Sequence, residues 1–257
     1  YPKIKDKIIN IERFIDEKKL ENSREDIINA KANNKYAYGK AFKYFKAAET
    51  VYELIEESNI KYVNHKEVNK KGIELIKDVF HNKEQKIEYD GFNIRHLFSA
   101  AYTPEGFVDY TETILETIEN IYFIQSEIGI GEQKILDTIL GLSKLKNYQL
   151  ELFYNPLIPE RIESIFIKDL NTIVTTNTKG EDFASSILDL SQYLDFDKIE
   201  NEDYSTFSFL IKKGMEFLKD AKKNHFLLEK AYRPTIDYSQ INTVREEIYK
   251  EILSYIV

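Results

Sequence analysis

The residues best placed to do chemistry follow a short apolar segment near the middle of the chain, Ile121–Gln125. Gly129 and Gly131 come next, and a helical pattern of apolar residues starts at Gln133. An apolar strand, a glycine-containing loop and the start of a helix form the layout of a phosphate-binding loop, whose pattern is G-x-x-x-x-G-K-[ST]. In such a loop, backbone N–H groups and the helix N-terminus attract phosphate oxygens. The segment predicts the shape of a phosphate loop, although two glycines alone also fit an ordinary strand-to-helix turn.

The side chains of this segment do not match the chemistry of the pattern. Ser126 replaces the first glycine, Glu132 replaces the lysine that neutralises the outer phosphates, and Gln133 replaces the Ser/Thr that holds Mg²⁺. Two unit charges ~4 Å apart interact by about 4 kcal/mol at an effective dielectric constant of ~20, so a reversed charge strongly opposes nucleotide binding. Lys134 lies two residues after Glu132 and points away from it on a helix. We therefore predict a vestigial phosphate loop, without a catalytic residue or a metal ligand, that consists of Ser126, Gly129, Gly131, Glu132, Gln133 and Lys134.

Composition narrows the classes of protein and partner. The 257 residues contain no cysteine, which excludes disulfide bonds, thiolate metal sites and cysteine nucleophiles. The net charge of −8 is uneven, because residues 1–90 hold 19 Lys and Arg against 17 Asp and Glu, whereas the remainder holds 17 against 27. Nucleic acids and polyphosphates bind positively charged surfaces, so the acidic remainder, which contains the loop, argues against both as partners.

The sequence also bears on location. No apolar run approaches the ~20 residues of a membrane-spanning helix, and no signal peptide is recognisable. Together with the absence of cysteine, this predicts a cytoplasmic protein without a membrane partner. Because the chain begins with Tyr1 rather than Met, we expect that further polypeptide precedes it.

Apolar spacing predicts a helical N-terminal third. Apolar and small residues recur at helical spacing over residues 35–57 and 68–80, and residues 59–64 break the pattern between them. The polar stretch 81–93 ends in Asp-Gly and is typical of a linker. The inner face of the second helix is expected to carry Ile73, Ile76, Val79 and Phe80.

Residues 91–257 are predicted to form an α/β domain. Strands are expected in the apolar run of 95–106, which a turn at Thr103–Gly106 closes, and at 121–125, 148–154, 163–167 and 172–176. Helices are expected at 109–119, 133–145, 182–195, 204–231 and 240–255, with Asp109 as the cap of the first. Only residues 168–171 separate the last two strands, which makes them antiparallel neighbours. We predict an α/β fold with a mixed, mostly parallel sheet flanked by helices.

The helical end of the chain repeats its helical beginning. Residues 8–21 match residues 187–200 at an offset of 179, and residues 44–56 match residues 217–229 at an offset of 173. The offset of 173 also pairs Val63-Asn64 with Ile236-Asp237 and Val68-Asn69 with Ile241-Asn242, so it continues through the turn and into the next helix. Two unrelated amphipathic helices would not keep that turn in register.

This repeat predicts a duplication. Residues 91–257 then form a degenerate P-loop NTPase-like domain with C-terminal helices. Residues 1–90 form a helical segment that is the back half of a preceding repeat. On this interpretation the chain is a fragment of a tandem protein whose other strand–loop–helix lies upstream of Tyr1.

A series of motifs occurs along the chain in a fixed order: Arg95–Gly106, the loop at 126–133, Asn155–Pro159, Ile167–Leu170, His225–Glu229, Tyr232–Pro234 and Asp237. Together they resemble an uncharacterised bacterial family of tandem P-loop ATPase-like proteins. The resemblance covers essentially the whole chain and implies a P-loop NTPase fold with two nucleotide-domain-like halves.

The same resemblance implies a second loss of function. In the intact loops of the family, the lysine and the Ser/Thr fall at the places of Glu132 and Gln133. An acidic residue and a histidine tend to follow the strand that corresponds to 172–176. This chain has Thr175, Thr176 and Asn177 there, so the acidic group that would assist Mg²⁺ binding is not evident either.

Two further pairs of residues have types that bind ions. His225 and Glu229 are four residues apart on one helix face, as metal ligands can be, but a hydrogen bond or ion pair on the helix surface is the commoner role of such a pair. Arg95 and His96 precede an apolar run, where they fit either an anion site or a solvated strand edge, and we favour the edge.

Two functional hypotheses follow. The first is a non-catalytic, degenerate P-loop NTPase-like module with a structural or regulatory role and no cofactor, paired with an upstream P-loop half of the same chain or with another protein. The second is an ATPase or kinase-like phosphotransferase that binds ATP and Mg²⁺ through a non-standard loop, with Lys134 or an upstream residue supplying the charge. The acidic balance and the two lost groups favour the first, so enzyme activity is not expected of this segment. A helical interaction domain without P-loop ancestry is a third hypothesis, which a sheet followed by a helix after residue 131 would exclude.

Overall fold

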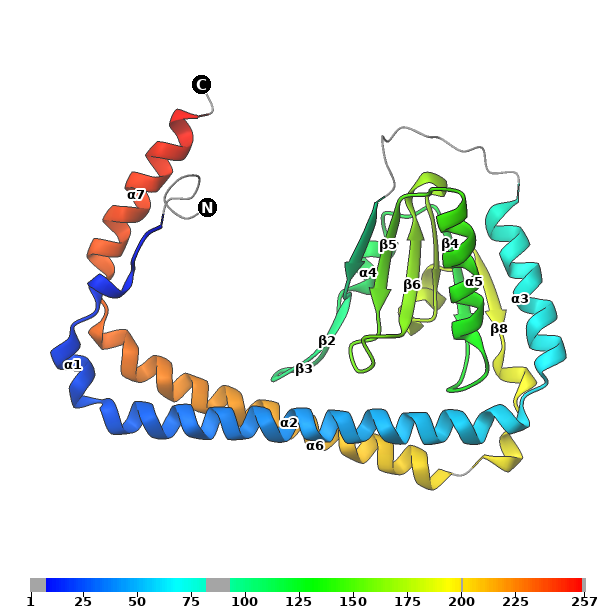
Figure 1. Cartoon of the computed structure of the whole chain (residues 1–257), viewed down its shortest axis with the longest axis horizontal. Coiled ribbons are helices and arrows are strands. Elements are labelled where there is room, and N and C mark those ends of the chain that lie inside the picture. The colour runs from blue at the N-terminus through cyan, green and yellow to red at the C-terminus, as the bar shows by residue number, and fades with distance from the viewer. Residues whose placement is uncertain (1–7, 82–92, 200, 256–257) are drawn as a thin grey trace. The chain divides into compact units, whose positions relative to one another are not determined.

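The fold is taken from a computed structural model of the chain (Figure 1), in which contacts divide the residues into two compact units. The helical unit comprises residues 1–40 and 217–257, and the α/β unit comprises residues 41–216. The boundary predicted between residues 90 and 91 concerns units of sequence and stays a prediction. The structure describes residues 8–81, 93–199 and 201–255.

A six-stranded sheet forms the centre of the α/β unit, in the order β1-β5-β6-β7-β4-β8. Strand β6 runs antiparallel to β5 and β7, while β1–β5, β7–β4 and β4–β8 are parallel pairs. The predicted α/β class with a mixed, mostly parallel sheet is confirmed, and so is the antiparallel pair that a short connection predicted. The strands are β1 (Ile94–Leu97), β4 (Asn120–Gln125), β5 (Leu150–Tyr154), β6 (Ile162–Ile167), β7 (Thr172–Thr175) and β8 (Ser186–Asp189), and the short η3 (Lys168–Leu170) joins β6 to β7.

Both faces of the sheet are covered. On one face, α5 (Glu132–Leu145) and α3 (His65–Phe80) share a core with apolar strand residues such as Val174. On the other face, α4 (Thr111–Leu115) and residues near it pack against Ile173. Successive strand residues point to opposite faces, which is why neighbouring residues of β7 belong to different cores. The buried β4 therefore delivers the loop after it into the interior of the unit.

A separate hairpin precedes α4. It pairs β2 (Ala100–Thr103) with β3 (Gly106–Asp109), and Gly106 at the turn has a φ of +132°, which favours glycine. The predicted single strand over 95–106 is thus β1 and β2, and β3 was missed. Asp109 ends β3 and accepts a hydrogen bond from the Thr111 N–H (2.8 Å), but the N-cap of α4 is Tyr110, so the predicted cap is wrong by one residue and α4 is shorter than expected.

Two long helices contribute residues to both units, α2 (Arg24–Asn59) and α6 (Asn201–Tyr232). The predicted helix over 35–57 lies within α2, which starts 11 residues earlier, at Arg24. After α2 comes η2 (Ile60–Tyr62), and the Asn64 side chain then accepts from the Glu67 N–H at the start of α3. In the helical unit, the Asn34 amide donates to the Ala221 carbonyl (2.9 Å) between α2 and α6. The remaining elements of that unit are η1 (Glu12–Phe14), α1 (Glu17–Asn22), η7 (Arg233–Thr235) and α7 (Tyr238–Ser254).

Residues 182–195 do not form the predicted helix. The chain instead makes η4 (Thr178–Phe183), β8 and η5 (Ser191–Tyr193), before η6 (Phe196–Lys198) leads into α6. Apolar residues in this stretch also fit helical spacing. Residues 186–189 nevertheless form β8, because they pair in parallel with one edge of β4. Pairing with a distant strand overrides the local pattern, as is common for strands.

The predicted inner face of α3 is confirmed for Val79, which is buried, and for Ile76 and Phe80, which pack against the core, but it is wrong for Ile73. Ile73 is 53% exposed, and the buried residues of this helix are Val68, Gly72, Leu75 and Val79. Of the predicted linker over 81–93, residues 82–92 lie outside the described residues.

The helices do not have the length and composition of membrane spans in the part of the chain that the structure describes. Over residues 8–81, 93–199 and 201–255, none is both long enough and apolar enough to cross a bilayer.

Candidate functional site

The loop predicted from the sequence lies at the carboxyl end of β4, between the ends of β7 and β8. Ligands of open α/β sheets bind at the carboxyl ends of parallel strands, so the loop occupies the position where a binding site is expected. The predicted strand, loop and helix are all present, since β4 ends at Gln125 and α5 begins at Glu132.

Both glycines of the loop adopt backbone conformations that favour glycine. Gly129 has a φ of +83° and Gly131 a φ of +114° at the N-cap of α5. A Cβ atom on Gly129 would also lie 2.9 Å from the Glu56 carbonyl oxygen of α2. The intervening Ile130 is fully buried. The glycines therefore allow the loop to turn sharply and α2 to approach it closely.

The carboxylate of Glu132 folds back onto the loop. Its Oε2 accepts a hydrogen bond from the Gly131 N–H (3.1 Å), and the residue is only 8% exposed. In a phosphate loop this N–H group would face the ligand. The chain's own carboxylate thus takes up a donor that an anion would use.

Arg161 joins Glu132 to α2. Its Nη2 donates to Glu132 Oε1 (3.1 Å), and its Nη1 donates to both oxygens of Glu56 (2.7 and 2.9 Å). The guanidinium lies over the ring of Tyr52, 5.2 Å from its centroid. Arg161 belongs to the connection between β5 and β6, where it donates its N–H to the Ile158 carbonyl (2.9 Å). Two carboxylates at the loop therefore share one cation.

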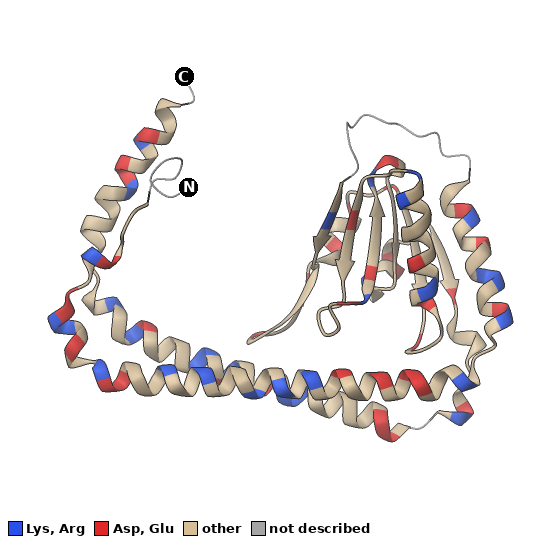
Figure 2. Cartoon of the chain, in the orientation of Figure 1, with Lys and Arg blue, Asp and Glu red and all other residues tan. Residues whose placement is uncertain are grey.

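The last turns of α2 cover the loop from outside. Tyr52, Glu56 and Asn59 lie on one helix face, and the Asn59 amide donates to the Ile128 carbonyl (2.8 Å) and to the Tyr204 hydroxyl (2.7 Å). This end of α2 is also acidic, as Figure 2 shows, because the charged residues after Lys46 are Glu49, Glu53, Glu56 and Glu57. These carboxylates repel a polyphosphate from the loop that α2 contacts.

The other predicted site residues lie apart from this contact. Gln133 donates to Asp137 (3.2 Å) on the surface of α5, and Lys134 donates to Asn69 of α3 (3.3 Å). Lys134 thus points away from Glu132, as its position on the helix predicted. Ser126 is half-buried at the start of the loop. The structure brings Gly129, Gly131 and Glu132 together, but not Gln133 or Lys134 with them.

A second polar cluster lies at the carboxyl end of β7, beside the loop strand. The Asn177 amide donates to Asp109 Oδ2 (3.0 Å) and to Glu163 Oε2 (3.3 Å), and its oxygen accepts from the Lys179 N–H (2.9 Å). Burial raises the pKa of Glu163, the Asn177 amide opposes that rise, and the Asp109 charge adds to it. The resemblance implies an acidic residue after β7. In this chain Asn177 lies there, and its amide binds the carboxylates of Asp109 and Glu163.

Burial also raises the pKa of the Glu132 carboxyl, whereas the backbone hydrogen bonds and the Arg161 charge oppose that rise. The site therefore contains two carboxyls, Glu132 and Glu163, that desolvation makes harder to ionise. Among the described residues, no group of three His, Asp or Glu side chains gathers as a metal site.

Sequence reasoning missed the residues that close the loop. Arg161 is 29 residues from Glu132 and 105 from Glu56, and no spacing rule links such positions. From the sequence, Tyr52 is only a residue of the predicted helix over 35–57, and Asn59 only the first residue of the break that follows this helix. A lone arginine among acidic residues at a strand connection was the only available signal.

The two pairs considered from the sequence as ion sites, His225 with Glu229 and Arg95 with His96, make contacts with other side chains on the surface. His225 Nε2 lies 3.4 Å from Glu229, which also accepts from Arg233 (2.8 Å), as expected of a helix-surface pair. Arg95 pairs with Glu151 (2.6 Å), and His96 Nδ1 lies 2.7 Å from the Tyr154 hydroxyl. Both lie on the edge strand β1, so the strand-edge interpretation is favoured over an anion site.

Comparisons of the chain with protein-family models, with curated proteins and with solved structures found no match. The resemblance to tandem P-loop ATPase-like proteins therefore stays a prediction from the sequence motifs.

Proposed function

We propose that the α/β unit is a degenerate P-loop NTPase-like module that does not catalyse a reaction and serves a structural or regulatory role. One observation carries this proposal: the Glu132 carboxylate is held between the Gly131 N–H and Arg161, where a phosphate oxygen would otherwise be bound. The loop keeps the backbone of an anion site and fills it with an anion of the chain itself.

Electrostatics supports this proposal. A nucleotide that entered the loop would have to displace Glu132 and leave Arg161 shared with the Glu56 carboxylate. Like charges ~4 Å apart repel by about 4 kcal/mol at an effective dielectric constant of ~20. The acidic end of α2 adds to this repulsion, so the bound state would be strongly disfavoured.

The end of β7 supports the proposal independently. A P-loop enzyme needs an acidic side chain there to help hold Mg²⁺. Asn177 carries no charge, and its amide is already bonded to Asp109 and Glu163. Loss of the lysine and loss of the acid both remove groups that nucleotide hydrolysis requires.

The alternative is an ATP-dependent ATPase or phosphotransferase with a rewired loop. It would need a cation near the phosphates, and the sequence offered Lys134 for this role. That side chain is bonded to Asn69 on the far side of α5 from the loop contact, which weighs against the alternative. We propose a cytoplasmic location, without a nucleic-acid or membrane partner, on the grounds of charge and composition given above.

Calorimetric titration of ATP, with and without Mg²⁺, tests the proposal. We expect no binding by the unmodified chain and weak binding by Glu132→Lys, which restores the missing charge beside a loop of suitable shape. Glu132→Gln is the matched control, because it removes the charge without supplying a cation. Circular dichroism spectra should show that both variants remain folded.

Two results would count against the proposal. Mg²⁺-dependent binding by the unmodified chain would favour the enzyme. Failure of every form to bind would leave the loop as an ordinary strand-to-helix turn, and the proposed P-loop origin would lose its main support.

A further inference from the structure

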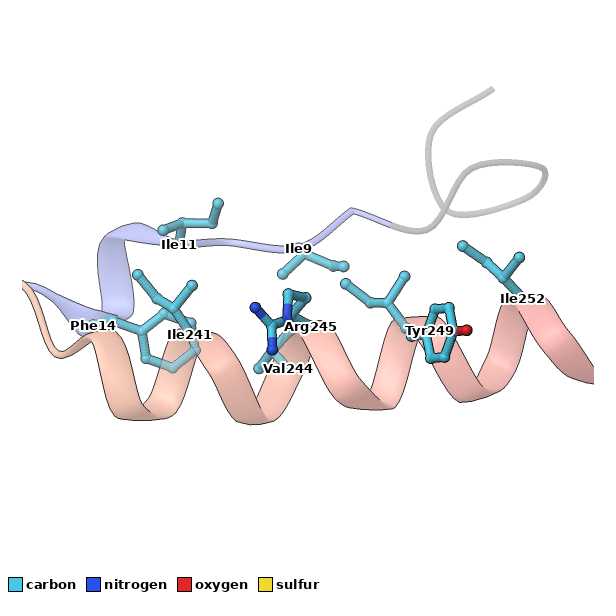
Figure 3. A pocket seen from close by; sticks show the side chains of 9 residues that line it. Ile9, Ile11, Phe14, Ile241, Val244, Arg245, Tyr249 and Ile252 are labelled. Carbon is cyan, nitrogen blue, oxygen red and sulfur yellow. The ribbon is translucent and has the colours of Figure 1, made fainter.

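An apolar groove lies open in the helical unit, where residues 8–14 run alongside α7 (Figure 3). It encloses about 410 Å³ and none of the 17 residues of α7 is buried. Exposed apolar grooves of this kind mark interaction surfaces. Its main lining residues are Ile9, Ile11, Phe14, Val244, Ile248 and Ile252.

The same local structure occurs a second time, in the α/β unit. The 3-10 helix η1 returns as η5 at an offset of 179 residues, and η2 returns as η7 at an offset of 173. The two isolated antiparallel bridges, Ile15–Ile236 and Val63–Leu194, are related by the same two offsets. These are the offsets at which the sequence repeats.

Backbone hydrogen bonds recur with this register. The Asp237 N–H donates to the Phe14 carbonyl (2.9 Å), as the equivalent Asn64 N–H donates to the Tyr193 carbonyl (2.9 Å). A second backbone pair is Asp16 N–H to Thr235 O (2.7 Å) with Asp195 N–H to Tyr62 O (3.2 Å). Hydrogen bonds to side chains recur too, from Glu12 N–H to Asn10 Oδ1 (2.9 Å) and from Ser191 N–H to Asp189 Oδ1 (2.9 Å). Each unit therefore contains one copy of the same binding surface, which we call a seat. It consists of a short segment, residues 8–14 or 187–193, and the helix beside that segment, α7 or α3.

The copy in the α/β unit is covered. Val79 of α3 and Leu190 after β8 are both 0% exposed, whereas their equivalents Ile252 and Ile11 are 54% and 56% exposed. The residues that cover this copy come from β4 and α5: β8 pairs with β4, and α3 shares its core with Ile135. What buries this kind of seat is thus a strand, a loop and the helix after it.

We propose that residues 8–254 contain an internal duplication, and that the open groove binds a second strand–loop–helix module that precedes residue 1 in the same polypeptide. In the α/β unit the covering elements β4 and α5 lie in the chain between α3 and β8, which are the equivalents of α7 and of residues 8–10. We place the second module ahead of residues 8–10, as β4 and α5 stand ahead of β8. Its strand would pair beside Ile9, and its helix would lie on α7.

The α/β unit of a second copy does not fit this role. Its β4 is already paired on both sides, by β7 and β8, and its α5 is already packed against α3. A second copy would have to unfold part of its own core to offer these elements.

The groove also differs from its copy in one informative position. Gly72 of α3 admits Ile135, to the point that a Cβ atom there would lie 2.8 Å from the Ile135 side chain. The equivalent residue in α7 is Arg245, whose side chain is 69% exposed and reaches Glu246 (2.7 Å). The helix that binds α7 should therefore carry a small or acidic residue where α5 carries Ile135.

Thiol labelling tests this proposal, because the 257 residues contain no cysteine and a single thiol can be placed among them at will. Single cysteines replace Ile252 in the groove, Val79 at its covered equivalent, and Ile73, which is 53% exposed on the outer face of α3. The rate of reaction with a maleimide is measured in the 257-residue chain and in the full-length product of its gene. The longer product is compared with its own form that lacks the introduced cysteine. No nucleotide is added, so the result is independent of the ATP titration.

In the 257-residue chain, we expect Ile252→Cys to react about as fast as Ile73→Cys, and Val79→Cys to react far more slowly. In the full-length product, Ile252→Cys should become at least about tenfold slower while Ile73→Cys is unchanged. Arg245→Glu should restore fast labelling there, and Arg245→Lys should not.

Three outcomes would overturn the proposal. Equally fast labelling of Ile252→Cys in both proteins would show that no module covers the groove. A gene product without polypeptide ahead of residue 1 would have the same meaning. Protection in the 257-residue chain that grows with protein concentration would identify a second copy as the occupant.

Discussion

The groove of the helical unit and its counterpart in the α/β unit are built alike but buried differently. Both place a short apolar segment beside a capped helix, with Asp237 and Asn64 as the equivalent caps. Only one of them is covered, and there Leu75 of α3 is 5% exposed, while α7 has no buried residue. Local sequence therefore determines the segment, the cap and the helix, whereas burial depends on what packs against them.

In the α/β unit, ion pairs of Arg161 also hold α2 against the loop. Removal of Arg161 should therefore cause the largest loss of stability among the variants considered. Arg161→Met leaves the Glu132 and Glu56 carboxylates together without their shared cation. Loss of one partner from a buried ion pair costs about 3–5 kcal/mol, so the free energy of unfolding should fall by that amount. Urea denaturation followed by circular dichroism measures it.

Arg95→Met is the matched control for this experiment. Arg95 also pairs with a carboxylate, Glu151, at 2.6 Å, but its side chain is 56% exposed. Exposed ion pairs contribute about 0–1 kcal/mol, so this variant should remain close to the unmodified chain. Equal losses in both variants would mean that Arg161 does not hold the loop and α2 together.

The comparison also explains which parts of the structure the sequence could reveal. Helices α2, α3, α5, α6 and α7 follow from apolar spacing, and the hairpin-like β6–β7 pair follows from its short connection. The segment at 182–195 failed because its strand β8 exists only through pairing with β4. Local periodicity carries no information on a strand edge some 60 residues away in the chain.

The candidate site divides in the same way. The positions of Gly129, Gly131 and Glu132 follow from a motif of fixed spacing, and the structure places them in one loop. The contacts of Arg161 with that loop depend on how the β5–β6 connection meets α2, which no spacing encodes. The sequence shows that Glu132 reverses the charge expected at this position, but it does not show that Arg161 pairs with it.

Matched truncations sharpen the comparison of the two seats. Leu75→Ala removes buried methyl groups from the covered copy, and core truncations of this kind cost about 2–5 kcal/mol. Ile248→Ala changes the equivalent position on α7, which is only half-buried, so in the 257-residue chain its cost should be under about 1 kcal/mol. Urea titrations of both variants, followed by circular dichroism, give the two losses.

The same truncations can break the comparison. If Ile248→Ala costs as much as Leu75→Ala in the 257-residue chain, the groove is already buried in solution and the two seats do not differ. Dilution then separates the causes, because burial by a second copy weakens at low protein concentration, whereas burial within one chain does not.

The smallest expected effect concerns pH, and it should arise in the α/β unit. Burial and the Asp109 charge raise the pKa of Glu163 above its value in the unfolded chain. The folded state therefore binds this proton more tightly, so the associated stability is complete below the unfolded pKa and is lost as pH rises through the folded pKa. Glu163→Gln removes this dependence, and the stability of this variant relative to the unmodified chain should rise as the pH increases above about 4. Glu116→Gln, an exposed change in the same unit, should show a constant difference over this range, and a matching rise there would mean that the trend reflects net charge rather than the burial of Glu163.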